Sequence, residues 1–137
     1  MRRSQELEDL VARWFAAAST GDASLVDTAV SLDPGARLIG SDPSEWLHGG
    51  EAVARFLRGE VTNAAGQAQF SPEGTEAFEE GTVGWATTRL TITLPDGGHV
   101  SPRWSAVFHR EGDTWRFVQT HASIGVANAD IGWIYPG

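Results

Sequence analysis

The chain has 137 residues, 41% of them hydrophobic, which is typical of one compact domain that spans residues 1–137. It contains no cysteine, which excludes disulfides, thiolate metal sites and cysteine nucleophiles. Because 18 acidic residues outnumber 10 basic ones and the formal net charge is −8, we expect no nucleic acid partner. No stretch has the pattern of a signal peptide or a membrane span, so we expect a cytoplasmic protein that does not bind membranes.

The chain begins with a predicted helix. From Gln5 onward, apolar residues recur every three or four positions, which places them on one helical face. Ser4 is suited to cap the start of this helix, and Gly21 can adopt the left-handed conformation that ends one. Asp22 then begins a second, shorter predicted helix that extends to Leu32.

The next segment is predicted to hold one strand and a third helix. Residues 36–40 favour a short strand that stops at the turn pair Asp42-Pro43. Residues 44–48 are predicted to form a loop. Helical spacing of apolar residues then returns over residues 50–61.

After residue 67 the chain is rich in β-branched and aromatic residues and is interrupted by turn residues. The predicted turns fall at residues 71–72, 80–81, 95–98 and 111–113. They delimit long antiparallel strands. Helices that come first and strands that follow predict an α+β domain in which the helices cover one face of a curved sheet.

Three segments resemble a known family. They are WFAAASTGD (residues 14–22), LIGSDPSEWLHG (residues 38–49) and WRFVQTHASIGV (residues 115–126). They resemble the SnoaL-like branch of the nuclear transport factor 2-like superfamily, and the likeness covers nearly the whole chain. The resemblance implies a cone-shaped α+β fold, with a curved antiparallel sheet and the N-terminal helices packed on its concave face around a pocket. It specifies a fold and not an activity.

Ketosteroid isomerases share this fold, but their catalytic residues do not carry over. Trp14 stands where that family has a tyrosine, and Gly40 stands where it has the aspartate base. Trp104 stands where it has a protonated aspartic acid. The ketosteroid isomerase mechanism is therefore not expected.

A polar group surrounds Trp46 in the predicted loop and consists of Asp42, Glu45 and His48. Asp42 lies two residues past the aspartate base position of the ketosteroid isomerases, so it is a candidate acid or base at the pocket mouth. The alternative is that Asp42 only begins a turn and that the other two side chains are solvated.

The last predicted strand carries the main catalytic candidate. Strand alternation predicts that Gln119, His121 and Ser123 share a face with Trp115 and Phe117 and form a cavity wall. His121 would transfer a proton or anchor a ligand, because imidazole titrates near neutral pH. Gln119 and Ser123 would donate hydrogen bonds. The alternative for His121 is a structural histidine that is hydrogen-bonded within the sheet.

Large aromatic residues are expected to line the pocket. Trp104 lies on the apolar face of the preceding strand and is predicted to point inward. We group with it Trp14, Trp46, Phe56 and Trp85. Flat apolar walls with few polar groups are typical of a small-molecule site. For each residue alone, packing in the core is the alternative.

The other face of the last strand is predicted to be apolar. It would hold Val118, Thr120, Ala122 and Ile124, with Val107 as a neighbour. Such a face is not left in water, and families of this fold commonly pair through it, so we expect a homodimer through the outer sheet face. The tail, residues 127–137, is expected to dock on the body or on the partner subunit.

The sequence leaves two functions open. One is a pocket protein for a small apolar organic molecule, acting as a cofactor-free isomerase, cyclase or dehydratase by acid/base chemistry. The other is a non-catalytic ligand-binding or dimerisation module. The four histidines have no short ligand spacing, so neither hypothesis includes a metal.

Overall fold

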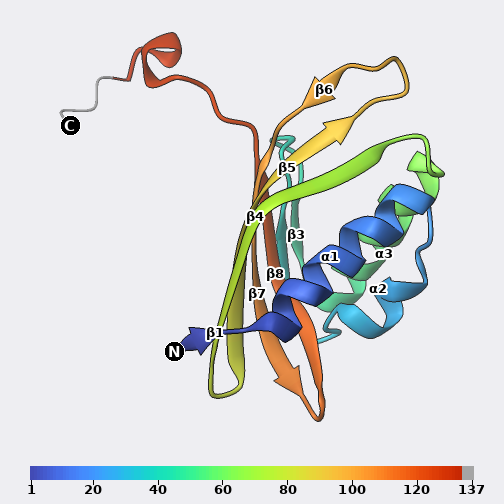
Figure 1. Cartoon of the computed structure of the whole chain (residues 1–137), viewed down its shortest axis with the longest axis vertical. Helices are drawn as coiled ribbons and strands as arrows, with labels where there is room; N and C mark the ends of the chain where they lie inside the picture. The colour runs from blue at the N-terminus through green and yellow to red at the C-terminus, as the bar shows by residue number, and fades with distance from the viewer. Residues whose placement is uncertain (134–137) are drawn as a thin grey trace.

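The computed structural model describes residues 1–133, in which helices pack against one side of a curved, open sheet (Figure 1). The helices are α1 (Gln5–Thr20), α2 (Ser24–Ala29) and α3 (Gly50–Ala64), and a 3₁₀ turn, η1 (Asn128–Ile131), follows near the end. The strands are β1 (Arg2–Arg3), β2 (Arg37–Ile39), β3 (Trp46–His48), β4 (Gln69–Glu80), β5 (Val83–Thr93), β6 (His99–Val100), β7 (Arg103–Glu111) and β8 (Thr114–Ser123). The α+β class is confirmed.

Helix α1 has the predicted bounds for the predicted reasons. The Ser4 hydroxyl accepts a hydrogen bond from the Leu7 backbone N–H at 3.2 Å. Gly21 ends the helix with φ of 78°, a left-handed conformation that favours glycine. The buried side chains are those of the predicted stripe, Leu7, Leu10, Val11, Trp14, Phe15 and Ala18.

The next elements differ in detail from the prediction. Helix α2 begins only at Ser24, because Asp22 instead accepts a hydrogen bond from the Ser24 backbone N–H at 2.9 Å and forms a turn. The predicted loop at residues 44–48 contains strand β3, which pairs with β2. A three-residue strand of this kind leaves no alternation long enough to recognise.

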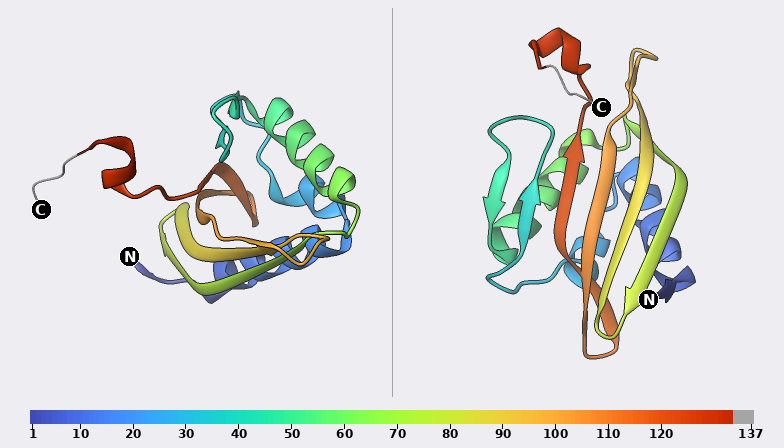
Figure 2. Two further views of the ribbon diagram at one scale, coloured as in Figure 1. Left: turned by 90° about the horizontal axis from the view of Figure 1, so that it is seen from above. Right: turned by 90° about the vertical axis from the view of Figure 1, so that its left-hand side faces the viewer.

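The strands form one sheet in the order β1-β4-β5-β7-β8-β2-β3, with β6 paired to β5. Figure 2 shows how strongly this sheet curves. Long antiparallel ladders join β4, β5, β7 and β8, as expected. The pairing of β2 with β8 is parallel, so the sheet is mixed rather than wholly antiparallel. Side-chain alternation within β2 carries no information on the direction of its neighbour.

The core fills the space between the helices and the concave face of the sheet. Phe108 and Phe117 are fully buried there. The ring of Trp14 on α1 lies 4.9 Å from that of Phe117, measured between centroids. Trp104 meets the ring of Phe15 edge-on at 5.1 Å. The prediction that Trp104 points inward is confirmed.

A β-bulge in β8 changes which side chains face the core. Phe108 of β7 pairs with Phe117, but Val107 pairs with Gln119, so Val118 is an extra residue. Alternation therefore shifts by one position. Phe117 and Thr120 both point inward, with 2% and 6% of their surfaces exposed. The predicted single face running from Trp115 to Ser123 is wrong beyond Phe117.

The bulge corrects both predicted faces of β8. Gln119, His121 and Ser123 lie on the outer face of the sheet, whereas Thr120 and Ala122 lie on the inner face. The outer face is therefore less apolar at this strand than predicted.

The chain leaves the sheet after Ser123 and projects away from the body (Figure 1). Ile131 and Trp133 are 66% and 59% exposed, so these residues do not dock on the body of their own chain, and docking on a partner subunit stays a prediction. Ile134 and Tyr135 lie outside the described residues. Within residues 1–133, no helix combines the length and apolarity needed to cross a bilayer.

Candidate functional site

A cavity of about 220 Å³ lies between the concave face of the sheet and helices α1 and α3. We call it the inner cavity. Strands β2, β4, β7 and β8 supply one wall, and the two helices supply the other. Its lining residues include Trp14, Phe15, Leu38, Phe56, Leu57, Val61, Phe70, Trp104, Thr120 and Ala122, with Glu45 and Glu60 at the rim.

Aromatic rings dominate the inner cavity. Of the predicted lining residues, Trp14, Phe56 and Trp104 are present. Phe15 and Phe70 complete the set, with ring centroids 6.4 Å apart and nearly parallel planes. These rings come from α1, α3, β4 and β7, so the cavity depends on the packing of the whole fold. Its walls suit a flat apolar molecule.

One polar side chain lies among the buried walls. Thr120 is 6% exposed and lines the cavity, whereas the buried side-chain atom without a partner in residues 1–133 is Nε1 of Trp115, which does not line it. The Thr120 hydroxyl can accept a hydrogen bond from a ligand or water in the cavity, or donate one to it.

The Glu45 carboxylate is fixed at the rim by the turn between β2 and β3. The Glu45 backbone N–H donates to the Asp42 carbonyl at 2.9 Å, and its own carbonyl accepts from Gly40 at 2.8 Å. One carboxylate oxygen accepts from the Asp42 N–H at 3.0 Å. The side chain lies directly over Gly40, where a Cβ atom would collide with it. The second carboxylate oxygen has no hydrogen-bond partner among residues 1–133.

Glu60 supplies a second carboxyl at the same rim, from the third turn of α3. The side chain as a whole is exposed, but its carboxyl is partly shielded from water where the helix borders the cavity. This burial raises the pKa of Glu60 above its ordinary value, and the nearby Glu45 carboxylate raises it further. Glu60 therefore keeps its proton to a higher pH than a solvated glutamate.

Six predicted site residues lie outside the inner cavity, and the first three of them are Asp42, Trp46 and Trp85. Asp42 is exposed, and hydrogen bonds from the hydroxyl and backbone N–H of Ser44 lower its pKa, which is the chemistry of a turn. Trp46 is 61% exposed. Trp85 stacks on Phe78 at 6.2 Å on the outer face of the sheet.

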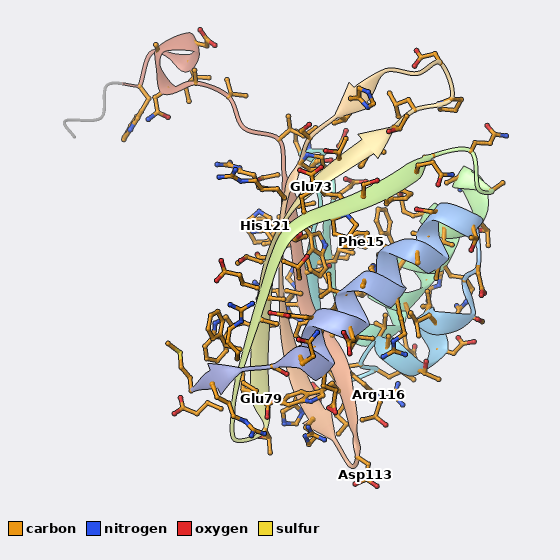
Figure 3. All side chains as sticks on the ribbon, in the orientation of Figure 1. Phe15, Glu73, Glu79, Asp113, Arg116 and His121 are labelled. Carbon is orange, nitrogen blue, oxygen red and sulfur yellow. The ribbon has the colours of Figure 1, made fainter. Side chains whose placement is uncertain are left out.

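The outer face has its own hollow, an open groove of about 800 Å³ that we call the outer groove. His121 and Ser123 line it together with Ser105, Thr87, Arg89, Arg103, Glu73 and Glu76, and Trp104 borders both hollows. Figure 3 shows His121 and Phe15 on opposite sides of the sheet. Gln119 is exposed on the same outer face.

His121 therefore does not share a cavity with the inward aromatic rings of α1 and α3. The catalytic role of His121 and the binding roles of Gln119 and Ser123 stay predictions, and any such role would be played on the outer face. Within residues 1–133, no three histidine, aspartate or glutamate side chains come together as metal ligands. The absence of a metal also stays a prediction.

Sequence reasoning missed Glu60, Phe70 and Thr120. The signal for Glu60 was present, because it lies four residues after Phe56 and so falls on the same helical face. Thr120 was assigned to the wrong face because a single bulged residue reverses the alternation.

Comparisons with known structures support the same fold. The chain is similar to an NTF2-like protein of unknown function from Pseudomonas putida KT2440, with 14% identity, a TM-score of 0.77 and coverage of 96% of this chain and 93% of that one. It is also similar to an uncharacterized protein with a cystatin-like fold from Caulobacter vibrioides, with 15% identity, a TM-score of 0.73 and 92% coverage of each chain. An NTF2-like protein from Novosphingobium aromaticivorans is 20% identical, with a TM-score of 0.70 and coverage of 96% and 88%.

At these identities the similarity establishes the fold alone. A comparison with curated proteins gives no match. The model of the SnoaL-like domain family matches residues 7–127, which span both helical and sheet layers and every residue of the inner cavity. The chain therefore belongs to the SnoaL-like domain family, within the nuclear transport factor 2-like fold.

Proposed function

We propose that the inner cavity binds a small, largely apolar organic molecule and acts on it by cofactor-free acid/base chemistry. The observation that carries this proposal is the pair of carboxyl groups, Glu45 and Glu60, at the rim of an aromatic cavity, one of them with a raised pKa. Perturbed carboxyl groups in a cleft are a common mark of proton-transfer sites.

The size of the inner cavity limits the ligand to about one substituted ring. An engineered apolar cavity of about 150 Å³ accommodates benzene, and the cavity here measures about 220 Å³. Binding sites for drug-sized ligands are larger, about 300–1,000 Å³. A polycyclic substrate would need the rim to open.

The two carboxyl groups suit complementary roles. The Glu45 carboxylate would take a proton from a carbon atom next to a carbonyl group. Glu60, protonated, would give its proton to the carbonyl oxygen, so that an enol forms. If the ketone carries a β,γ double bond, this enol is a dienol. Return of a proton from Glu45 to its γ-carbon, with return of the hydroxyl proton to Glu60, would then move the double bond into conjugation and complete an isomerisation. These proton transfers require no cofactor.

The comparison with ketosteroid isomerases supports this assignment of the base. Their aspartate base corresponds to Gly40, which has no side chain. The Glu45 side chain lies over Gly40 and brings a carboxylate into the space next to that position. Glu45, five residues further along the chain, would then replace the aspartate base that is missing at Gly40.

Hydrogen–deuterium exchange tests the proton-transfer step without knowledge of the natural substrate. Cyclohexanone in D₂O should exchange its α-protons faster with the protein than with buffer, as measured by NMR. The exchange should be lost in Glu45→Gln and reduced in Glu60→Gln, and His121→Ala should retain it. Exchange that persists in the double Glu45→Gln, Glu60→Gln variant would refute the assignment.

The alternative function is a non-catalytic ligand-binding or dimerisation module. Its support is a row of apolar side chains across the outer face, where Phe78, Trp85 and Val107 pair in register on β4, β5 and β7. Val83 next to this row is 42% exposed. We propose that a homodimer would cover this row. Light scattering after size-exclusion chromatography should give twice the monomer mass for the wild-type protein. The Trp85→Glu variant should give the mass of one monomer. A monomeric wild-type protein would refute the dimer.

A further inference from the structure

We propose that the ligand of the inner cavity carries a protonated amine on a single-ring apolar body. This inference rests on the proposed function, because it concerns the same cavity and names the chemical class of its ligand. Its basis is that the cavity has acidic residues at its rim, aromatic residues in its walls and no positively charged residue among the described residues of its lining.

The charge lining the inner cavity is of one sign. Glu45 and Glu60 are its only ionisable lining residues among those the structure describes, and neither forms an ion pair within residues 1–133. No arginine among the described residues lines the cavity, and Arg55, five residues before Glu60, is exposed on α3. Arg58 pairs with Asp27, and Arg37 donates to the carbonyl groups of Pro34 and Ala36.

When Glu60 is ionised, its carboxylate and that of Glu45 repel each other, which is one cause of the raised pKa of Glu60. The amine would bind this doubly ionised form, which is distinct from the form with Glu60 protonated that donates a proton. A cation held between the two carboxylates would relieve that repulsion, whereas a carboxylate or phosphate would add to it. The net charge of −8 also raises the local concentration of cations around the protein. The electrostatics of the rim therefore select an ammonium group over an anionic one.

The walls next to this rim suit the same head group. Ammonium groups are attracted to the faces of aromatic rings, most strongly to indole, when they lie within about 6 Å of the ring centroid. Trp14, Phe15, Phe56, Phe70 and Trp104 line the cavity that Glu45 and Glu60 border. The rings would hold the apolar body of the ligand and stabilise the cation where it enters.

A series of three compounds that share one ring tests the head group. Benzylamine, benzyl alcohol and benzoate present a cation, a neutral group and an anion, and their affinities can be measured by isothermal titration calorimetry. Benzylamine should bind about tenfold tighter than benzyl alcohol, and benzoate should bind more weakly than the alcohol. In Glu45→Gln, Glu60→Gln protein the amine should fall to the affinity of the alcohol.

The outcomes separate this inference from the proposed function. If benzyl alcohol binds as tightly as benzylamine, or if the preference for the amine survives in the double variant, the proposal of an amine ligand is refuted. The cavity then remains a ligand site. If none of the three binds, the cavity and the amine are both refuted. Glu51→Gln is the matched control, because it removes one negative charge from α3 away from the cavity and should keep the preference.

Discussion

The two hollows of this protein share a sheet but differ in chemistry. The inner cavity is aromatic with two acids at its rim, whereas the outer groove is polar and holds both Arg89 and Arg103 and both Glu73 and Glu76. Strands β7 and β8 line both, with neighbouring residues that point to opposite sides. For the residues of β8 beyond Phe117, one bulge decides which of the two hollows each side chain faces.

The largest expected difference between the two faces is in stability. Phe117→Ala removes a fully buried ring from the core and should lower the free energy of unfolding by about 3–5 kcal/mol. Gln119 follows the bulge and lies exposed on the outer face, so Gln119→Ala should change the free energy of unfolding by no more than about 0.5 kcal/mol. Urea unfolding of both variants measures the contrast. A Gln119→Ala cost as large as that of Phe117→Ala would mean that the two residues share a face.

Ligand binding sharpens the comparison with two neighbouring residues. Ala122→Phe places a ring into the inner cavity, and Ser123→Phe places the same ring into the outer groove. Cyclohexanone affinity, followed by ligand-observed NMR, should fall about tenfold or more in Ala122→Phe, which corresponds to at least about 1.4 kcal/mol. It should stay within about twofold in Ser123→Phe. The reverse pattern would place the ligand in the outer groove.

The smallest effect is on the pH dependence of stability. Because the folded state raises the pKa of Glu60, it holds this proton more strongly than the unfolded chain does. The group therefore stabilises the fold below the ordinary glutamate pKa of about 4.3, and that contribution is lost as the pH rises through the folded-state pKa.

Glu60→Gln should consequently be more stable than the wild-type protein at pH 7. Solvent screening at the rim limits the gain to about 0.3 kcal/mol, and the pH-dependent part of the difference should vanish below about pH 4. Thermal unfolding of both proteins across this pH range measures the difference in stability. The prediction would be wrong if the stability of Glu60→Gln relative to the wild-type protein were lower at pH 7 than at pH 4.

Local rules were sufficient for much of the fold. The cap at Ser4, the stop at Gly21 and the stripe between them follow from side-chain chemistry within one helix. The inward face of β7, with Trp104 and Phe108, follows from unbroken alternation. The parallel pairing of β2 with β8 was not predictable, because it joins segments about 80 residues apart whose relative direction no local pattern records.

The candidate site was predicted less completely, for the same reason. Trp14, Phe56 and Trp104 belong to regular elements, and the structure places them in the inner cavity. The extra residue Val118 has no distinctive side chain, and the bulge arises from the pairing of β8 with β7. Glu45 and Glu60 come together only because the β2–β3 turn lies against α3, which is a tertiary contact.

The most direct test of the account is to locate a neutral ring by intermolecular nuclear Overhauser effects. Cyclohexanone bound to the protein should give contacts to the methyl groups of Leu57, Val61 and Ala122, which line the inner cavity. Contacts to the Thr87 methyl group and the His121 ring, both in the outer groove, would contradict the account and move the functional site to the opposite face of the sheet.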